Sequence, residues 1–327
     1  MAAITHRASS LLCLFFLAAL ATSNQAVEAP LKNPLSYNAF SLQSFNENVA
    51  TRLFVNTQTH KDLWRRIRDG FSWETAAHNP RVRKQIQAFL NNPGAVEKIA
   101  KNAAPFLYLI VAEIERRGMP MELALLPMVE SRYEPNAKSP VGASGLWQIM
   151  PATGRHLGLK HTAWYDGRKD IQASTEAALK YLDFFNTNNV FDGDWLLSLA
   201  AYNAGEGSVR KAMRRNSRTG KPKDYWNLPL PQETKDYVPK LLALATILSN
   251  PEKYNLDLPH LPNHAHLASV TVDAHTKLTE VMKLANMSAE QFYQLNPGFT
   301  RAARPNQDYE VLLPIENARL LELNLGV

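Results

Sequence analysis

One carboxylate stands out as a candidate acid because of the apolar run before it. Glu130 follows seven mostly apolar residues, Leu123 to Val129, and lies near the end of a predicted helix. Glutamate is rarely buried without a partner, and a carboxyl group in an apolar cleft has a raised pKa and can hold a proton near neutral pH. Such a group could protonate a glycosidic oxygen. Taken alone, the segment favours a simpler interpretation, a helix-end glutamate that faces water.

Three further segments contain residue types suited to binding a sugar. The first runs from Gly142 to Gly154 and includes a tryptophan and an amide beside glycines, which allow close approach of the backbone to a ligand. The second is Ala201-Tyr-Asn-Ala-Gly205, and the third is Glu233-Thr-x-x-Tyr-Val238. Aromatic rings cover the apolar faces of pyranoses, and amides bind hydroxyl and acetamido groups. Each residue alone could equally belong to a core or a helix cap.

Together, and in this order, the segments resemble the signatures of the lytic murein transglycosylases of the membrane-bound type D, over roughly residues 60–320. The resemblance implies a mainly α, lysozyme-like fold with an active-site cleft. It implies that Glu130 is the catalytic acid and base. It also implies a substrate-binding role for seven groove residues, which are Ser139, Gln148, Met150, Tyr202, Asn203, Glu233 and Tyr237.

The implied reaction cleaves the β-1,4 bond between MurNAc and GlcNAc without water and leaves a 1,6-anhydro-MurNAc end. Ordinary glycosidases use two carboxyl groups, but Glu130 has no obvious partner. Glu134 sits at the helix stop before Pro135, and Asp166 and Asp170 are more typical of loop and helix-cap acids. One carboxyl group suffices if the C6 hydroxyl of MurNAc attacks C1 of its own ring, since internal attack gains from proximity. We expect no cofactor.

Two other functions stay open. A hydrolytic muramidase of the goose-lysozyme type would share the fold and use water, and a second acid across the cleft would favour it. A non-catalytic peptidoglycan-binding protein would not need the intact Glu130-Ser131 motif. Phosphate-loop, dinucleotide, serine-hydrolase and zinc-protease motifs are absent from the sequence. A group of histidines in a proline-rich segment is more typical of a solvated loop than of a metal site, so we expect no metal; these are His260, His264 and His266.

The elements that must position these residues are predicted to be helices. Leu107, Ile110, Val111 and Ile114 recur at i, i+3, i+4 and i+7, which is one buried helical face. A second helix is predicted from Pro120 to about Tyr133, and the same periodicity recurs as far as residue 250. After residue 265 the pattern changes to strand, helix, helix and strand, with a capping box from Ser288 to Gln291.

We therefore predict a helical catalytic domain and a small α+β, LysM-like C-terminal module, joined by a proline-rich linker at 251–262. The predicted boundaries are 1–26 for a signal peptide, 27–104 for an N-terminal helical extension, 105–255 for the catalytic domain and 265–327 for the LysM-like module.

The N-terminus predicts export. An apolar run from Leu11 to Ala21 follows His6 and Arg7 and is too short to span a bilayer comfortably, which is typical of a signal peptide. Cleavage after Ala21 or Ala26 would suit the small residues there, and an uncleaved membrane anchor stays open as the alternative. We expect an exported, periplasmic protein that is associated with the membrane or the wall.

Two features depart from the family. Its members usually carry a lipid on a mature N-terminal cysteine, whereas Cys13, the only cysteine, lies within the predicted signal and lacks a lipoprotein cleavage site. They also usually end in clear LysM repeats, whereas here only one divergent module precedes Val327. From these departures we do not expect the resemblance to imply tight anchoring in the wall.

The charge distribution predicts an acidic partner. The net charge is +6, and the segment from Gly207 to Lys223 contains seven Lys or Arg and no acid. It is either a solvated helix end or a contact with a polyanion. Export excludes nucleic acid, so the expected partner is the glycan strand of peptidoglycan; protein partners are not indicated.

Overall fold

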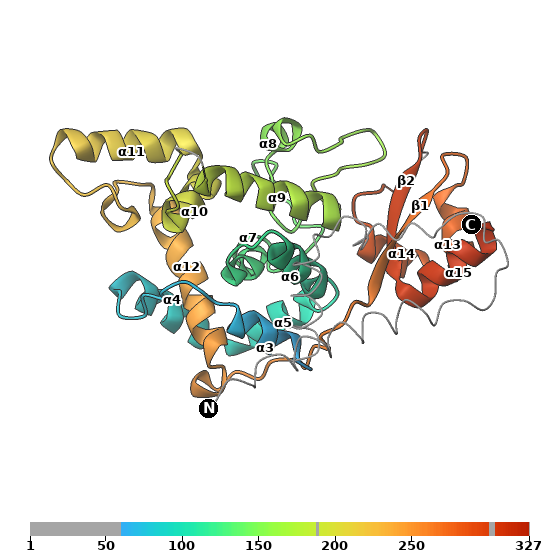
Figure 1. The fold of residues 1–327 in the computed structure, drawn as a ribbon, viewed down its shortest axis with the longest axis horizontal. Helices are drawn as coiled ribbons and strands as arrows, with labels where there is room; N and C mark the ends of the chain where they lie inside the picture. The colour runs from blue at the N-terminus through green and yellow to red at the C-terminus, as the bar shows by residue number, and fades with distance from the viewer. Residues whose placement is uncertain (1–59, 188–189, 301–304, 327) are drawn as a thin grey trace, which may run out of the picture. The chain divides into compact units, whose positions relative to one another are not determined.

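The computed structural model describes residues 60–187, 190–300 and 305–326. The predicted signal peptide, Cys13 and the first part of the predicted N-terminal extension lie outside the described residues. The described part consists mostly of helices with one two-stranded sheet (Figure 1), so the prediction of a mainly α fold with a small α+β module is confirmed. None of its helices is both long and apolar enough to span a bilayer.

The helical part runs from residue 63 to residue 254. Its elements are α3 (Leu63–Asp69), α4 (Pro80–Leu90), α5 (Pro93–Ala103), α6 (Leu107–Arg116), η2 (Met121–Leu125), α7 (Leu126–Glu130), α8 (Pro151–His156), α9 (Ile171–Asn186), α10 (Trp195–Ala204), α11 (Glu206–Arg218), η3 (Tyr225–Asn227), α12 (Gln232–Ser249) and η4 (Glu252–Tyr254). The C-terminal part contains β1 (Leu267–Val272), α13 (Leu278–Leu284), α14 (Ala289–Leu295), β2 (Tyr309–Pro314) and α15 (Ile315–Leu325).

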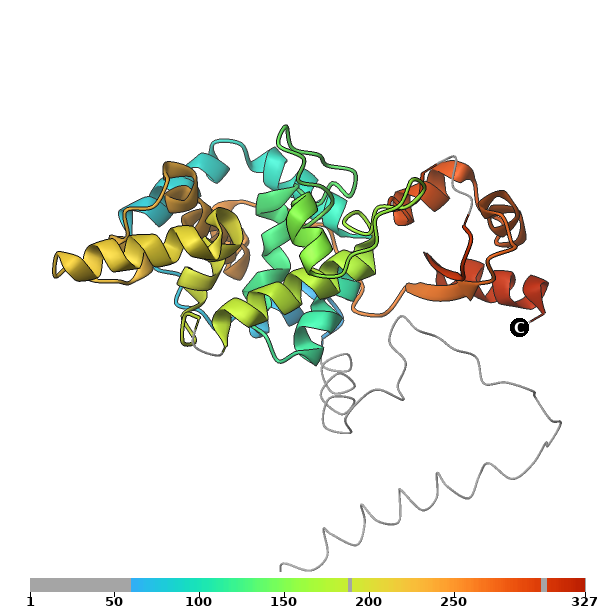
Figure 2. The same cartoon turned by 90° about the horizontal axis from the view of Figure 1, so that it is seen from above.

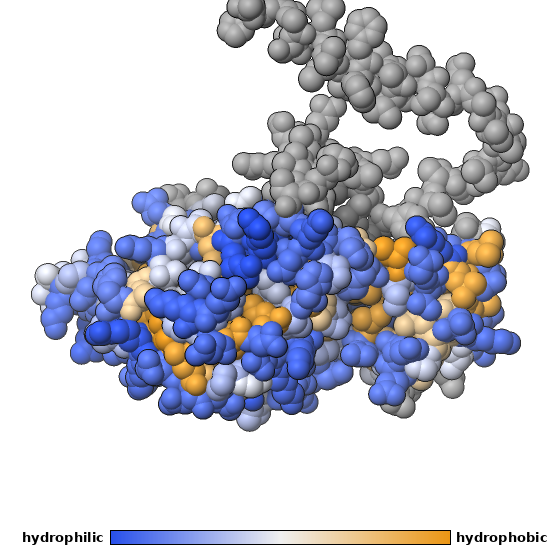
Figure 3. Space-filling model, turned by 90° about the horizontal axis from the view of Figure 1, so that it is seen from below, coloured by the Kyte–Doolittle hydropathy of each residue, from blue (hydrophilic) through white to orange (hydrophobic). Residues whose placement is uncertain are grey.

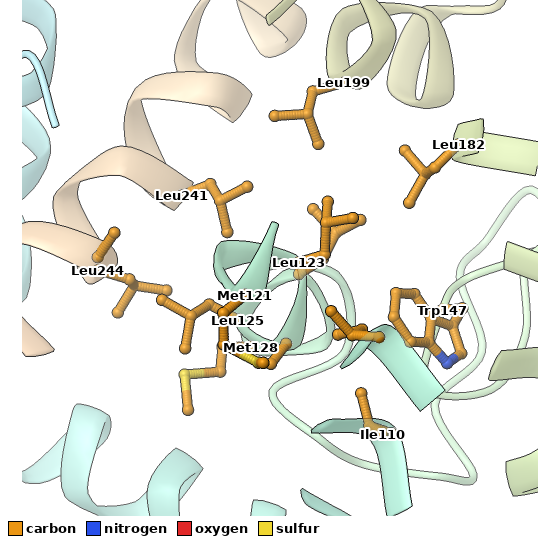
Figure 4. Packing of buried hydrophobic residues seen from close by; sticks show 14 of the residues in the cluster. Ile110, Met121, Leu123, Leu125, Met128, Trp147, Leu182, Leu199, Leu241 and Leu244 are labelled. Carbon is orange, nitrogen blue, oxygen red and sulfur yellow. The ribbon is translucent and has the colours of Figure 1, made fainter. Parts of the chain in front are cut away.

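The segment that leads to Glu130 lies at the centre of the helical core. Residues 123–126 of η2 and α7 are fully buried. Figure 4 shows this segment among the side chains of α6, α9, α10 and α12, which include Ile110, Leu182, Leu199, Leu241 and Leu244. A run of apolar residues with no polar face suits an element that is enclosed on all sides. The apolar run before Glu130 is therefore explained by burial, and it anchors the glutamate on a rigid support.

The predicted second helix ends earlier than its sequence pattern indicated. It starts as the 3-10 turn η2 and stops at Glu130, three residues before Tyr133. Arg132 and Tyr133 have φ values of 55° and 56°, in the left-handed region that ends a right-handed helix. The reversal buries the ring of Tyr133 and brings its hydroxyl within 2.6 Å of the Ala124 carbonyl, to which it donates.

The predicted linker is partly packed against the helical part. The Trp64 indole donates to the Pro259 carbonyl at 3.0 Å, and the Leu63 amide donates to the Leu261 carbonyl at 2.8 Å. Asn263 is buried and accepts from the Arg66 guanidinium at 2.8 Å. One continuous hydrophobic core runs from Leu63 in α3 to Leu261. The domain boundaries stay a prediction, but residues 259–263 belong to the structural support of α3.

The C-terminal part contains the predicted strands, both predicted helices and one further helix. Strands β1 and β2 pair antiparallel with Val270 opposite Val311, and the capping box of Ser288 and Gln291 at α14 is confirmed. The sequence analysis missed α15. Its buried positions, which include Ala318 and Leu321, are too few for a clear helical period.

Hydrophilic side chains cover much of the face that Figure 3 shows. Figure 3 shows one face on which apolar patches are separated by hydrophilic side chains. The exposed large apolar residues among those described are Val141, Met150, Phe184 and Leu323.

Candidate active site

Glu130 is the last residue of α7, where the buried segment reaches the surface of the core. Its side chain is half-buried. The Tyr237 hydroxyl of α12 donates a short hydrogen bond to Glu130 Oε1, across 107 positions of sequence. The structure therefore pairs the candidate acid with one of the predicted groove residues.

The surroundings of Glu130 raise its pKa to about 7. Burial is the main cause, because it disfavours the charged carboxylate, and the charge of Glu233 adds to the effect. The hydrogen bond from Tyr237 and the charge of Lys240 act in the opposite direction and lower the pKa. A carboxyl group with a pKa near 7 can both give and take a proton near neutral pH.

Helix α12 supplies all three of these neighbours from one face. Glu233, Tyr237 and Lys240 are spaced i, i+4 and i+7, which brings their side chains to the same side of a helix. Tyr237 itself is buried. The tyrosine therefore contacts Glu130, with an acid one turn before it and a base one turn after it.

A groove of about 270 Å³ includes Tyr202 in its lining, and the charge of Glu130 acts on the hydroxyl of that tyrosine. It is lined by Gln148, Ile149, Met150, Thr153, Tyr181 and residues 201–205. Four of the predicted substrate-binding residues belong to this lining, and the lining contains no carboxylate. Burial raises the pKa of the Tyr202 hydroxyl, and the charge of Glu130 raises this pKa further. The second effect shows that this groove residue and the candidate acid interact electrostatically.

The loop before Met150 is folded tightly enough to require a glycine. Gly145 has a φ of 81°, and a Cβ atom placed on it would lie 2.0 Å from the Arg168 carbonyl oxygen. Gln148 also adopts a left-handed conformation, with φ 47°, and its amide donates to the Gly145 carbonyl at 2.9 Å. These contacts hold the backbone of Gln148 at the wall of the groove.

Two hydrogen bonds fix the end of α10 against its neighbours. The Tyr202 hydroxyl donates to the Trp147 carbonyl at 2.8 Å. The Thr234 hydroxyl of α12 donates to Asn203 Oδ1 at 2.7 Å. The groove wall is thus tied both to the loop at Trp147 and to the helix that carries Tyr237.

Three predicted substrate-binding residues lie outside the groove lining, namely Tyr237, which contacts Glu130, and Ser139 and Glu233. Ser139 accepts a hydrogen bond from the Ala143 amide at 3.0 Å, so its hydroxyl closes its own turn, and no hydrogen bond joins it to Glu130 in the described structure. Glu233 is exposed on α12 and acts on Glu130 through its charge.

Sequence reasoning overlooked Tyr181 and Lys240. Tyr181 lines the groove, and its ring lies 6.0 Å from that of Tyr202. An aromatic residue at the edge of an apolar face was the available signal. Nothing local marked Lys240, because its effect depends on the approach of α7 to α12.

The other acids considered have structural roles. Asp166 is paired with Arg168 at 2.8 Å, and Asp170 is the N-cap of α9, where it accepts from the Ala173 amide at 2.8 Å. Their interpretation as loop and helix-cap acids is confirmed. Within the described ranges no group of three or more His, Cys, Asp or Glu is arranged to hold a metal ion; His266 instead lies 3.0 Å from the Pro105 carbonyl.

Two family models match the chain. The Transglycosylase SLT domain matches residues 108–225, and the LysM-like domain of lytic transglycosylase MltD matches residues 266–326. The first therefore covers the segments around Glu130, Gln148 and Tyr202, and the second covers the C-terminal part.

Individual relatives are similar over different shares of the chain. A membrane-bound lytic murein transglycosylase D of Escherichia coli (strain K12) is 45% identical over 72% of this chain, which spans about half (52%) of that relative. A putative tributyltin chloride resistance protein of Alteromonas sp. (strain M-1) is 37% identical over 52% of this chain and 80% of its own length. A solved lytic transglycosylase Slt of Pseudomonas aeruginosa is 28% identical and has a TM-score of 0.36, covering 44% of this chain and 24% of its own. On the strength of the matching family models and relatives, this chain belongs to the family of lytic murein transglycosylases with a transglycosylase SLT domain.

Proposed function

We propose that this protein is a peptidoglycan lytic transglycosylase that cleaves the β-1,4 bond between MurNAc and GlcNAc and leaves 1,6-anhydro-MurNAc ends. The observation that carries the proposal is Glu130, a carboxyl group with a pKa of about 7 that accepts a hydrogen bond from Tyr237 and acts by its charge on Tyr202 of the groove. The names of the related transglycosylases support the same reaction.

In the first half of the reaction, Glu130 acts as a general acid. Its proton passes to the glycosidic oxygen as the bond from C1 of MurNAc to that oxygen breaks. The pKa of about 7 means that roughly half of the free enzyme carries this proton at pH 7. The hydrogen bond from Tyr237 then stabilises the carboxylate that remains.

In the second half, the Glu130 carboxylate acts as a general base. It takes the proton of the C6 hydroxyl of the same MurNAc, and O6 forms a bond to C1. One bond breaks, one bond forms, the proton returns to Glu130, and water is not consumed. Internal attack gains from proximity, because nucleophile and electrophile belong to one ring.

The route without water needs one carboxyl group, and the groove lining supplies no second one. Inverting glycosidases need a second carboxylate on the opposite face of the sugar to activate water. The lining offers amide, hydroxyl, thioether and aromatic groups instead. Glu233, whose charge acts on Glu130, lies on the same helix face as Tyr237 and is the acid to test.

We assign the remaining predicted residues to substrate binding. Gln148, Met150, Tyr202 and Asn203 would line the sugar site, with Tyr181 as a further ring beside them. Tyr237 would position the acid. Ser139 and Glu233 would act from outside the groove lining, Ser139 by shaping its loop and Glu233 by its charge.

We also propose that the protein works in the periplasm, on the cell wall. The E. coli relative is named membrane-bound, and the matched LysM-like domain at 266–326 suits binding to glycan. The reaction as written needs neither a cofactor nor a metal.

The test is the chemistry of the ends produced from purified peptidoglycan. Mass spectrometry should find anhydromuramyl ends, each lighter by one water than the hydrolytic product. Glu130→Gln should lose about 10²–10⁴-fold in activity while still folded. Glu134→Gln, a change of an exposed acid close by in sequence, is the matched control and should keep activity.

Reducing ends in place of anhydro ends would refute the proposal in favour of the muramidase. Loss of cleavage in Glu233→Gln as complete as in Glu130→Gln would identify Glu233 as a second catalytic acid. Near-normal turnover by Glu130→Gln would place the acid elsewhere.

A further inference from the structure

Helix α11 carries a basic face on the side away from the core. Lys211, Arg214, Arg215 and Arg218 are exposed, and their spacing of i, i+3, i+4 and i+7 puts them on one face. We call these four residues the basic stripe. The opposite face is buried through Val209, Ala212 and Asn216. Lys221 and Lys223, also exposed, extend the positive charge beyond the helix.

The charge of the basic stripe is not neutralised within the described structure. Arg210 on the same helix is paired with Glu206 at 2.6 Å, but no described acid forms an ion pair with any member of the stripe. Like charges at i, i+3 and i, i+4 repel and destabilise a helix. The helix dipole favours Arg215 and Arg218 in the last turn, but not Lys211 and Arg214. An anionic partner would relieve this repulsion.

The exposed residues of α11 indicate that the helix would bind a partner through charge and not through apolar contact. None of the exposed large apolar residues of the described structure belongs to this helix. An amphipathic helix that inserts into a membrane presents large apolar side chains beside its cations. The stripe therefore suits carboxylates of a soluble or polymeric ligand better than a lipid surface.

The stripe begins within reach of the groove. Gly205, which lines the groove, directly precedes α11. At a rise of 1.5 Å per residue, Lys211 lies about 9 Å and Arg218 about 20 Å along the helix from Gly205. Figures 1 and 2 show α11 running outward from its junction with α10. An extended peptide of four residues spans about 13 Å, so a peptide attached to a sugar in the groove can reach the stripe.

We propose that the basic stripe binds the carboxylates of the stem peptides borne by the glycan strand in the groove. The inference rests on the proposed function, because only a peptidoglycan strand brings such peptides to Gly205. Arg guanidinium groups bind carboxylates through paired hydrogen bonds, and the stripe offers three of them beside one lysine. The protein would thus favour peptide-bearing strands over bare glycan.

The test measures binding without turnover, in the full chain carrying Glu130→Gln. The probes are labelled soluble glycan strands of equal length, one set with stem peptides and one set from which the peptides have been removed. The test variant changes all four residues of the stripe to glutamine. The control changes four exposed cations of α4 and α5 to glutamine, namely Arg83, Lys84, Lys98 and Lys101.

The stripe variant should bind peptide-bearing strands about two- to fivefold more weakly, because a peptide of about 13 Å reaches the stripe as far as Arg214 and makes one or two exposed ionic contacts of ordinary strength there. It should bind the bare strands as its parent does, and the difference should shrink as salt rises. The control should bind both probes normally. An unchanged affinity for peptide-bearing strands, or an equal loss on both probes, would overturn the inference.

Vesicles of anionic phospholipid are the third probe. A loss of binding confined to these vesicles would overturn the inference and identify a lipid contact instead. The product analysis of the proposed function is independent, since it uses the active enzyme. Hydrolytic ends would refute the proposed chemistry without removing a difference in binding between the two kinds of strand.

Discussion

The hydrogen bond from Tyr237 to Glu130 predicts how the activity should depend on pH. The proposed reaction needs Glu130 protonated at the start, so the alkaline limb of the profile of kcat/KM should report its pKa, about 7. Tyr237 donates to the carboxylate and so favours the charged form. In Tyr237→Phe this stabilisation is lost, the pKa of Glu130 rises, and the alkaline limb should move to higher pH.

The size of the shift follows from the strength of such a bond. A hydrogen bond to a charged group contributes about 1.5–3 kcal/mol, and 1.36 kcal/mol corresponds to one pKa unit. We expect a shift of at least about one unit, since water can replace only part of the lost bond. At pH 8 about 9% of the wild-type enzyme would carry the proton, against about half of Tyr237→Phe.

The assay is kcat/KM on soluble glycan between pH 5 and about pH 9, with each variant scaled to its own maximum. Tyr202→Phe is the matched control, because the Tyr202 hydroxyl donates to the Trp147 carbonyl and not to Glu130. Its alkaline limb should stay near that of the wild type. An unmoved limb in Tyr237→Phe, or one displaced to lower pH, would refute the reasoning.

Three further outcomes are expected. The folded protein raises the pKa of Glu130 from 4.5 to about 7. Protonated Glu130 therefore contributes free energy of folding that is fully present below pH 4.5 and is lost as pH rises through 7. Glu130→Gln should be more stable than wild type at pH 8, by up to about 3 kcal/mol in chemical denaturation, with no gain at pH 4. Gly145→Ala should destabilise the fold by more than the ~1–2 kcal/mol expected from a left-handed alanine, since its Cβ would meet the Arg168 carbonyl oxygen at 2.0 Å. Gly158→Ala, with φ 80° and no neighbour within 4 Å, measures the backbone cost alone. Equal losses of stability in the two variants would contradict the clash. A chain ending after Ala265 keeps the packed segment 259–263 and should stay folded by circular dichroism and still cut soluble glycan. A folded but inactive truncation would show that the C-terminal module takes part in the chemistry.

Local patterns in the sequence identified much of the fold and the candidate acid. The helical period of residues 107–114, the alternation in β1 and β2 and the capping box at Ser288 all arise from neighbours a few positions apart, which a sequence displays directly. Glu130 was found through the apolar run before it and through the order of the matched segments. The site residues as a set stay predictions, since their roles await the variants above.

What the sequence by itself determined was therefore the class of the elements and the identity of the candidate acid. Only the tertiary structure decided the pKa of that acid, because burial and the bond from Tyr237, 107 positions away, are long-range effects. It also decided that Tyr181 joins the groove, and that α7 stops at Glu130 where the backbone turns left-handed to bury Tyr133. The periodicity of a sequence shows which side of a helix or strand is apolar. The desolvation of a side chain and its contacts depend on which other elements pack against that side.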